Sequence, residues 1–339
     1  MLFRSRLALA GWAVTALLSV GVIAGLGAAG LVRDYVPVAL ALTTTALGTL
    51  LPILHDNNML TGDFGRYVLA AGAVGELCPI LAIAVFLTER DHFAALLSVA
   101  AVGLVAIVLI SLPYIPRPRG APARRSAPPG GGRPDRGLAR IIREGQDTTG
   151  QTTLRWAVVL LFLLLVVASR FGLDVVLGAV LAGIVLRGWT RRANIDTEGL
   201  EQKFDALGYG FFIPVFFIWS GMTLDIAGIA DNPLRVLIFF LLLLFTRGLP
   251  SMIIYRRSLP VRQRVQMTFI TATGMPLLIA LAEIGLRDGK MLPANAAALV
   301  GAGVLSVLVF PAAAVRLSGR PPGPRPGRPA PAELPSDSK

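Results

Sequence analysis

Long apolar stretches alternate with short polar segments along the whole chain of 339 residues. Most of these stretches contain the roughly 17–25 residues that a helix needs to cross the hydrocarbon core of a bilayer. The pattern predicts an all-α polytopic membrane protein with about ten transmembrane helices, at residues 7–30, 35–54, 66–88, 92–115, 154–170, 172–189, 207–227, 234–255, 265–286 and 292–316.

Two polar segments fall outside this pattern. Both are rich in proline, glycine and arginine, and neither contains enough apolar residues to build a folded core. We therefore expect four parts along the chain: a first membrane half at 1–115, a cytoplasmic linker at 116–153, a second membrane half at 154–318 and a disordered cytoplasmic tail at 319–339.

The formal net charge of +12 comes from arginines that are distributed unevenly between the two sides of the membrane. If the N-terminus is cytoplasmic, six of the 32 basic residues fall in outer loops, Arg247 falls inside a span, and the remaining 25 lie on the inner side. Positive charge gathers on the cytoplasmic side of membrane proteins. The distribution predicts a multi-pass protein of the cell (plasma) membrane, surrounded by lipid, with both termini in the cytoplasm. It gives no reason to expect binding to nucleic acid.

Several other chemistries find no support in the sequence. The single cysteine excludes an internal disulfide, and no cluster of histidine and cysteine indicates a structural metal or a cofactor. The predicted spans contain no Ser/His dyad and no pair of carboxylates within the membrane. We therefore do not expect an enzyme.

Two charged residues are predicted to lie deep in the membrane. Glu76 is about 13 Å and Arg247 about 12 Å from the cytoplasmic edge of its span, at a rise of about 1.5 Å per helical residue. A charged side chain at such a depth costs roughly 2.5–3.5 kcal/mol on insertion scales, so it indicates a functional site. The simpler alternatives are a neutral Glu76 that hydrogen-bonds between helices and an Arg247 that extends to the interface.

The second and ninth spans share an unusual order of residues. One contains TTTALGTLLPI and the other TATGMPLLIAL, so each has threonines, then a glycine, then a proline and an apolar run. Glycine and proline weaken a helix, and a break within the membrane is tolerated where the backbone is buried in protein or lines a cavity. A matched pair of breaks is typical of a transporter binding site, although two kinked helices would have the same residues. The predicted broken-helix residues are Thr43, Thr44, Thr45, Thr273, Gly274 and Met275.

Three segments together resemble one family of membrane proteins. They are GYGFFIPVFFIWSGMTLD at 208–225, LDVVLGAVLAGIVLRG at 173–188, and ALTTTALGTLLPIL followed by GDFGRYVLAAGAVGELCPIL in the first half. In this order they resemble the second monovalent cation:proton antiporter family, which includes the Kef-type potassium and NapA-type sodium exchangers. The resemblance implies an inverted-repeat antiporter fold with two broken crossing helices, a dimerisation domain and a moving core domain.

The resemblance also implies where the site lies. The acidic pair of the family falls on Gly75 and Glu76, its basic residue on Arg247, and its two breaks on residues 43–45 and 272–275. One member of the acidic pair is thus a glycine, which leaves one ionisable group. The family has two or three further spans before the first one here, so we expect either a misassigned start of the chain or a shortened relative, and a homodimer if those spans exist.

These features favour a secondary active transporter that exchanges Na+ or K+ for protons. The cation and the proton would compete for Glu76, with Thr44 and Thr45 as further oxygen ligands and no metal other than the transported cation. Arg247 would stabilise ionised Glu76, and because arginine does not release its proton we expect an electroneutral exchange of one proton per cation. The alternatives are a transport-inactive homologue or partner subunit, and an exporter of an organic solute on the same scaffold.

Overall fold

The computed structural model describes residues 2–28, 35–87, 92–111, 152–173, 175–193, 198–222 and 225–319 of the chain. Every regular element within these ranges is a helix, as the sequence pattern predicts. The chain is therefore an all-helical membrane protein. The predicted linker at 116–153 and the predicted tail at 319–339 lie almost wholly outside the described residues.

The described helices form two compact units, which are not two consecutive pieces of the chain. The first unit combines Met1–Pro79 with Leu224–Lys339, and the second is Ile80–Thr223. The boundary between them falls inside helix α4 (Gly62–Phe86), at Pro79. The division into two membrane halves along the chain remains a prediction.

The first unit contains the helices from both ends of the chain. They are α1 (Leu2–Ala28), α2 (Tyr35–Ala41), α3 (Leu47–Asp56), most of α4, α11 (Ile226–Asp231), α12 (Pro233–Leu242), the π-helical segment η3 (Leu243–Gly248), α13 (Pro250–Ile254), α14 (Val261–Ala272), α15 (Pro276–Arg287) and α16 (Pro293–Arg316). The second unit contains α5 (His92–Ser111), α7 (Thr152–Arg170), α8 (Val175–Ala193), α9 (Glu198–Leu207), the π-helical segment η2 (Gly208–Phe212) and α10 (Ile213–Met222).

Six helices or helix pairs in the described part of the chain are long and apolar enough to cross a membrane. They are Arg4–Ala28, Gly62–Phe86, Gln202–Met222, Pro233–Ile254, Val261–Arg287 and Pro293–Arg316. The other predicted spans are mostly helical where they are described, but their helices are shorter, less apolar or divided, as 35–54 is divided by non-helical residues into α2 and α3. The total of ten spans therefore remains a prediction.

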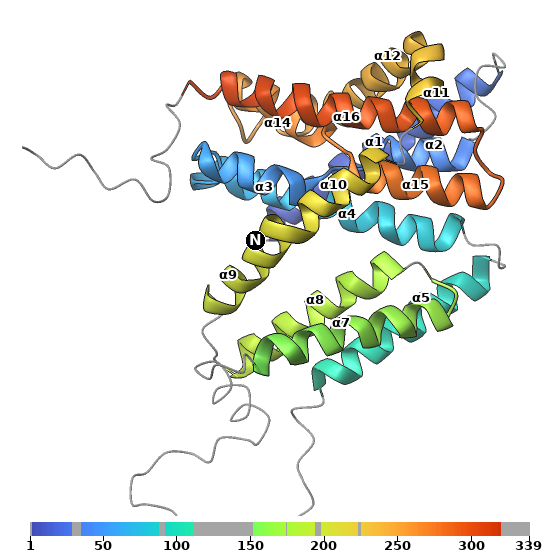
Figure 1. Cartoon of the computed structure of the whole chain (residues 1–339). Helices are drawn as coiled ribbons and strands as arrows, with labels where there is room; N and C mark the ends of the chain where they lie inside the picture. Colours follow the sequence, from blue (N-terminus) through green and yellow to red (C-terminus); the bar gives the residue numbers. More distant parts are fainter. Residues whose placement is uncertain are drawn as a thin grey trace, which may run out of the picture. The chain divides into compact units, whose positions relative to one another are not determined.

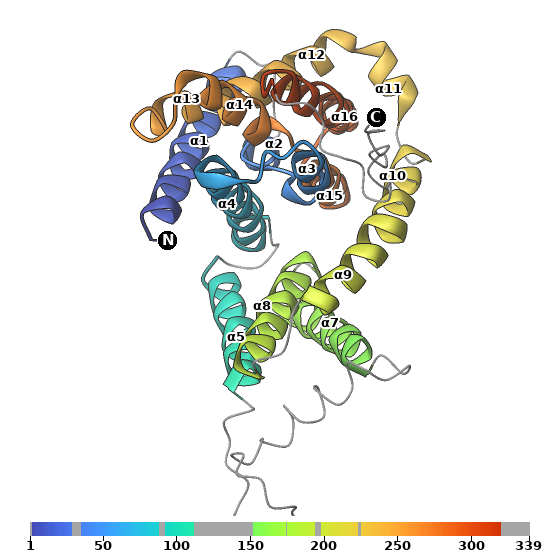
Figure 2. The same ribbon diagram turned by 90° about the vertical axis from the view of Figure 1, so that its left-hand side faces the viewer.

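Helix α16 makes many of the helix–helix contacts of the first unit. It packs against α12, α14 and α15, and also touches α11 and α3. Figure 2 shows α2, α3 and α15 in the middle of this unit, among α1, α4, α14 and α16. Buried side chains of α3, α4 and α14, including Leu50, Leu54, Val68 and Met267, form one apolar cluster. This cluster holds α3 and α14, which adjoin the two predicted breaks, against α4, which carries Glu76.

Local sequence signals explain where several helices of the first unit begin and end. Proline occupies the start of α12, α15 and α16, where its missing N–H costs nothing and its fixed φ suits the first turn. Asp225 accepts a hydrogen bond from the N–H of Gly228 at 2.9 Å and so caps α11, as its position at a span end suggests. The chain leaves α15 through Gly289, whose φ of 64° favours glycine.

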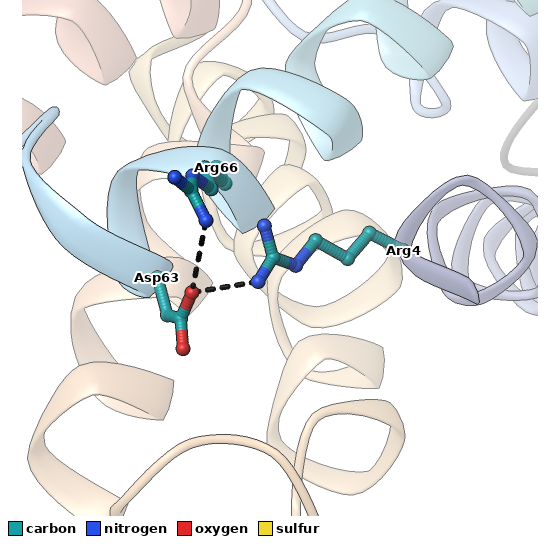
Figure 3. A network of polar contacts seen from close by, with 3 residues as sticks. All are labelled: Arg4, Asp63 and Arg66. Carbon is teal, nitrogen blue, oxygen red and sulfur yellow. Dashed lines mark hydrogen bonds and ion pairs between the residues drawn. The ribbon is translucent and has the colours of Figure 1, made fainter. Parts of the chain in front are cut away.

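An ion pair joins the start of α1 to the start of α4. Arg4 Nη2 lies 2.6 Å and Arg66 Nη1 3.6 Å from Asp63 Oδ1 (Figure 3). The Arg4 guanidinium also lies 5.3 Å from the centre of the Tyr67 ring. Because 71% of the Asp63 side chain is exposed, each pair stabilises the fold by no more than about 1 kcal/mol. The network orients the ends of the two helices more than it stabilises them.

The second unit is organised around the helix pair α7 and α8. Helix α8 packs against both α7 and α5, and Figure 1 shows these three helices side by side. Their shared core includes Ala106 of α5, Leu160 and Leu164 of α7, and Val185 of α8. The chain continues through α9, η2 and α10 as one helical rod (Figure 1). This rod contains most of the segment at 208–225, one of the three segments that resemble the antiporter family.

The packing of α7 predicts different costs for two adjacent leucines. Leu164 is fully buried, whereas Leu163 is 48% exposed. Leu164→Ala should lower the free energy of unfolding by about 2–5 kcal/mol, because it leaves a cavity, and Leu163→Ala should change it little. Thermal unfolding of the purified protein in detergent measures both. Equal shifts for the two variants would contradict this packing.

Candidate functional site

The first interruption lies between α2 and α3. The backbone leaves the helix after Ala41 and returns to it at Leu47. Thr43 and Thr44 use their hydroxyls locally: Thr43 Oγ1 donates to the carbonyl of Leu40 at 2.7 Å, and Thr44 Oγ1 donates to that of Ala41 at 2.8 Å. The same two carbonyls also accept the backbone N–H groups of Thr43 and Thr44, so each accepts two hydrogen bonds at the end of α2. The hydroxyl oxygens retain capacity to accept.

The second interruption lies between α14 and α15. Thr273, Gly274 and Met275 are non-helical, and Pro276 begins the next helix. The N–H of Gly274 donates to Ser306 Oγ of α16 at 3.2 Å. A buried backbone donor needs a partner, and here a hydroxyl from a neighbouring helix replaces the missing helical carbonyl.

The two interruptions contact each other directly. The N–H of Ala46 donates to the carbonyl of Thr273 at 2.8 Å. A Cβ atom on Gly274 would lie only 2.9 Å from Thr44 Oγ1, so the approach of the two segments requires glycine at this position. Each broken helix therefore depends on the other for its hydrogen bonds and for its packing.

Helix α4 lies against the first interruption and brings Glu76 to it. The N–H of Thr45 donates to the carbonyl of Gly75 at 3.0 Å. The side chain of Glu76 is half-buried, and its Oε1 accepts a hydrogen bond from the N–H of Gly48 at 3.1 Å. Gly48 is the second residue of α3, and the N–H groups at the start of a helix are free donors with a partial positive charge. The partner of the Glu76 carboxylate is thus the N-terminus of α3.

Arg247 reaches the same place from η3. Only 4% of its surface is exposed. Its Nε donates to Thr45 Oγ1 at 2.9 Å, and its Nη2 donates to the carbonyl of Ala71 at 3.3 Å. Thr45 Oγ1 in turn donates to the carbonyl of Thr271, at 2.8 Å. A single hydroxyl therefore links the buried guanidinium to the last turn of α14.

Arg247 is held without an ion pair in the part of the chain that the structure describes. No carboxylate of these residues, Glu76 included, lies within ion-pair distance of its guanidinium. Its hydrogen-bond acceptors are neutral, and the neighbouring last turn of α14 is a C-terminal end, which carries partial negative charge. The two deep charges predicted from the sequence lie in one region but are stabilised by opposite ends of different helices.

The predicted site residues all lie at the two interruptions or on the helices that contact them; they are Thr43, Thr44, Thr45, Glu76, Arg247, Thr273, Gly274 and Met275. Three hydrogen-bond partners of these residues are not predicted from the sequence: the N–H of Gly48, the carbonyl of Ala71 and the hydroxyl of Ser306. A lone hydroxyl within an apolar span is a signal that could have identified Ser306. Gly48 is the glycine of the TTTALGTLLPI pattern, but nothing in the sequence indicates that its N–H or the carbonyl of Ala71 is a hydrogen-bond partner.

Comparison with known proteins gives a family match. The model described as "Sodium/hydrogen exchanger, transmembrane" matches residues 134–317, which is more than half of the chain and includes Arg247 and the second interruption. The first interruption and Glu76 lie outside that range.

Curated relatives extend the similarity over more of the chain. The chain is 24% identical over 264 residues to the Bacillus subtilis (strain 168) protein described as "Putative Na(+)/H(+) antiporter YjbQ", a match that covers 76% of this chain and 38% of that protein. It is 24% identical over 296 residues to the glutathione-regulated potassium-efflux system protein KefC of Enterobacter sp. (strain 638). This match covers 85% of this chain and 43% of that protein. The chain is 23% identical over 289 residues to KefC of Salmonella heidelberg (strain SL476), a match that covers 83% of this chain and 42% of that protein. The chain spans about two fifths of the length of these relatives.

The hydrogen bonds of the threonines predict unequal effects of replacing them by valine. Thr45→Val removes both the acceptor for Arg247 and the donor to Thr271 while keeping the shape, and should cost about 3 kcal/mol because a buried charged donor loses its partner. Thr43→Val removes one local bond and should cost about 1 kcal/mol. Chemical or thermal unfolding compares the two. A Thr45→Val variant no less stable than Thr43→Val would be inconsistent with this arrangement.

Proposed function

The chain belongs to the transmembrane sodium/hydrogen exchanger family, and on that basis we propose that it exchanges a monovalent cation, Na+ or K+, for protons across the cell membrane. The family is one of transporters and not of enzymes. Two kinds of relative support the choice of ions: one is described as a Na+/H+ antiporter and others as potassium-efflux proteins. The observation that carries the proposal is the Glu76 carboxylate, which accepts a hydrogen bond from the start of α3 in one of two interrupted helices that contact each other.

Glu76 is the site for which the proton and the cation compete. When neither is bound, the ionised carboxylate is stabilised by the N–H of Gly48 and the N-terminus of α3. A carboxylate offers about four acceptor positions, so this bond leaves room for a ligand. The hydroxyl oxygens of Thr44 and Thr45 and the non-helical backbone carbonyls of the first interruption provide further hard oxygen donors of the kind that such cations bind.

Arg247 supplies a permanent positive charge that does not take part in proton exchange. Its guanidinium keeps its proton, unlike a lysine in the same place. With one exchangeable carboxylate, one proton leaves for each monovalent cation that binds, and the exchange is electroneutral.

The arrangement in the membrane follows the same proposal. The two interrupted helices are the crossing helices of an inverted-repeat fold, one from each membrane half. The Lys/Arg distribution places both termini in the cytoplasm.

Neutralising Glu76 should abolish exchange. In proteoliposomes containing a pH-sensitive dye, addition of Na+, K+ or Li+ in turn should move protons for the wild type and identify the ion. Glu76→Gln and Glu76→Ala should show no cation-driven proton movement, because the shared carboxylate is gone. Glu283→Gln provides the matched control, since Glu283 is an exposed carboxylate on α15 of the same unit.

Exchange that survives in both Glu76 variants would show that the coupling carboxylate lies elsewhere. No proton movement by folded wild-type protein with any of the three ions would overturn the proposal. The transport-inactive partner or the organic-solute exporter would then take its place.

Electroneutral exchange also predicts that voltage alone moves no protons. The measurement uses proteoliposomes with equal pH and equal concentrations of the exchanged cation on both sides, and a membrane potential set by an ion that the protein does not carry. A protonophore added at the end verifies that the potential was present. Proton movement that depends on the protein before that addition would exclude a one-to-one exchange.

A further inference from the structure

Gly75 has no room for a side chain. It is buried in α4, directly before Glu76, and its carbonyl accepts the hydrogen bond from the N–H of Thr45. A Cβ atom at this position would overlap Arg247 Nη2 and would lie 2.7 Å from Thr45 Oγ1. Real Cβ atoms essentially never approach other heavy atoms this closely, so any other residue at position 75 forces a neighbour to move.

The guanidinium of Arg247 occupies the space that this side chain would need. Its Nη2 donates to the carbonyl of Ala71, which lies one helical turn before Gly75 on the same face of α4. Its Nε donates to Thr45, the other residue that a Cβ at Gly75 would meet. The guanidinium is therefore seated along α4 between residues 71 and 75.

We propose that Gly75 is a specificity-determining residue, because the absence of a side chain leaves room for the Arg247 guanidinium as a resident cation against the segment of α4 that carries Glu76. Position 75 can hold either a side chain on α4 or the guanidinium from η3, but not both. Gly75 thereby sets the charge of the site, which has one fixed positive group and one exchangeable carboxylate. The effect of Gly75 on transport rests on the cation/proton exchange proposed above.

The resident cation has a characteristic effect on affinity. A fixed positive charge lowers the affinity of Glu76 for a proton and for a monovalent cation by the same factor, because both ligands carry one charge. At acid pH, where Glu76 is protonated, the cation must displace a proton, so the two reductions in affinity cancel and the apparent cation affinity is unaltered. At alkaline pH, where Glu76 is ionised, the apparent cation affinity is reduced by the whole factor. Removing or displacing the guanidinium should therefore strengthen cation binding at alkaline pH only.

The shared space is tested by the stability of four purified variants. They are Gly75→Ala, Arg247→Gln, the double variant, and Gly21→Ala as control, since a Cβ at Gly21 of α1 meets nothing within 4 Å. Gly75→Ala should lower the unfolding temperature by several degrees relative to the control, roughly 5 °C. In the Arg247→Gln background the same change should cost less than half as much. If Gly75→Ala alone does not fold, the double variant should regain folding.

Two results of this stability cycle would overturn the proposal. One is an equal cost of Gly75→Ala in both backgrounds, which would assign the clash to Thr45 alone. The other is a Gly75→Ala variant that does not fold and that Arg247→Gln does not rescue. Because no transport is measured, these outcomes are independent of whether the protein exchanges ions.

The charge effect is tested by the cation concentration for half-maximal exchange at several pH values. For Arg247→Gln and Gly75→Ala it should fall on the order of tenfold at the alkaline limit and stay unchanged at the acid limit. Arg247→Lys keeps the charge only while its ammonium is protonated, so its half-maximal cation concentration should move toward that of Arg247→Gln at the most alkaline pH. A uniform change at all pH values would indicate a merely structural role and contradict the proposal. If the wild type does not exchange ions but the stability cycle shows coupling, the exchange fails while the shared space stands.

Discussion

The bond between Arg247 Nε and Thr45 Oγ1 is the interaction on which the rest of the site depends. Arginine is charged at any physiological pH, and a buried charge without hydrogen-bond partners is among the most costly defects that a protein interior can contain. The first interruption provides the hydroxyl, α4 provides a carbonyl, and the same hydroxyl extends to the last turn of α14. One side chain from η3 thus requires three separate segments to be in place together.

This constraint explains why two helices are broken where they meet. A continuous helix would use its own carbonyls and would present a nonpolar surface to the guanidinium. The interruptions instead expose the negative end of α14 near Arg247 and the positive end of α3 near Glu76. The two charges are therefore satisfied independently in this structure. Protonation of Glu76, or binding of a cation to it, does not leave Arg247 without its hydrogen-bond partners.

Much of this could be predicted from the sequence, and the limits have physical causes. The Thr-Gly-Pro patterns are local signals that adjoin both interruptions, at residues 43–45 and 273–275. In the first pattern, however, Gly48 and Pro52 lie inside α3, after the non-helical residues. The depths of Glu76 and Arg247 follow from counting helical residues, but depth does not determine which face of a helix a side chain occupies. The sequence therefore predicts a similar depth for the two charged residues. It does not predict that Glu76 accepts a hydrogen bond from α3 or that Arg247 donates one to Thr45.

The role of Gly75 depended on information that no single segment contains. In the sequence it is one glycine among 36, and it stood out only as a departure from a family pattern. Its meaning comes from a side chain more than 170 residues away, seated where a Cβ would be. Long-range packing of this kind, like the backbone partner Gly48, is set by the register of packed helices, which apolar periodicity does not specify.

The most direct test of the account is the number of protons released when a cation binds to the purified protein in detergent. Isothermal titration calorimetry in buffers with different ionisation enthalpies gives that number without any transport. The account predicts a release that approaches one proton per cation as the pH is lowered, and none for Glu76→Gln. A release above one, or an unchanged release in Glu76→Gln, would contradict the claim that a single carboxylate couples the two ions.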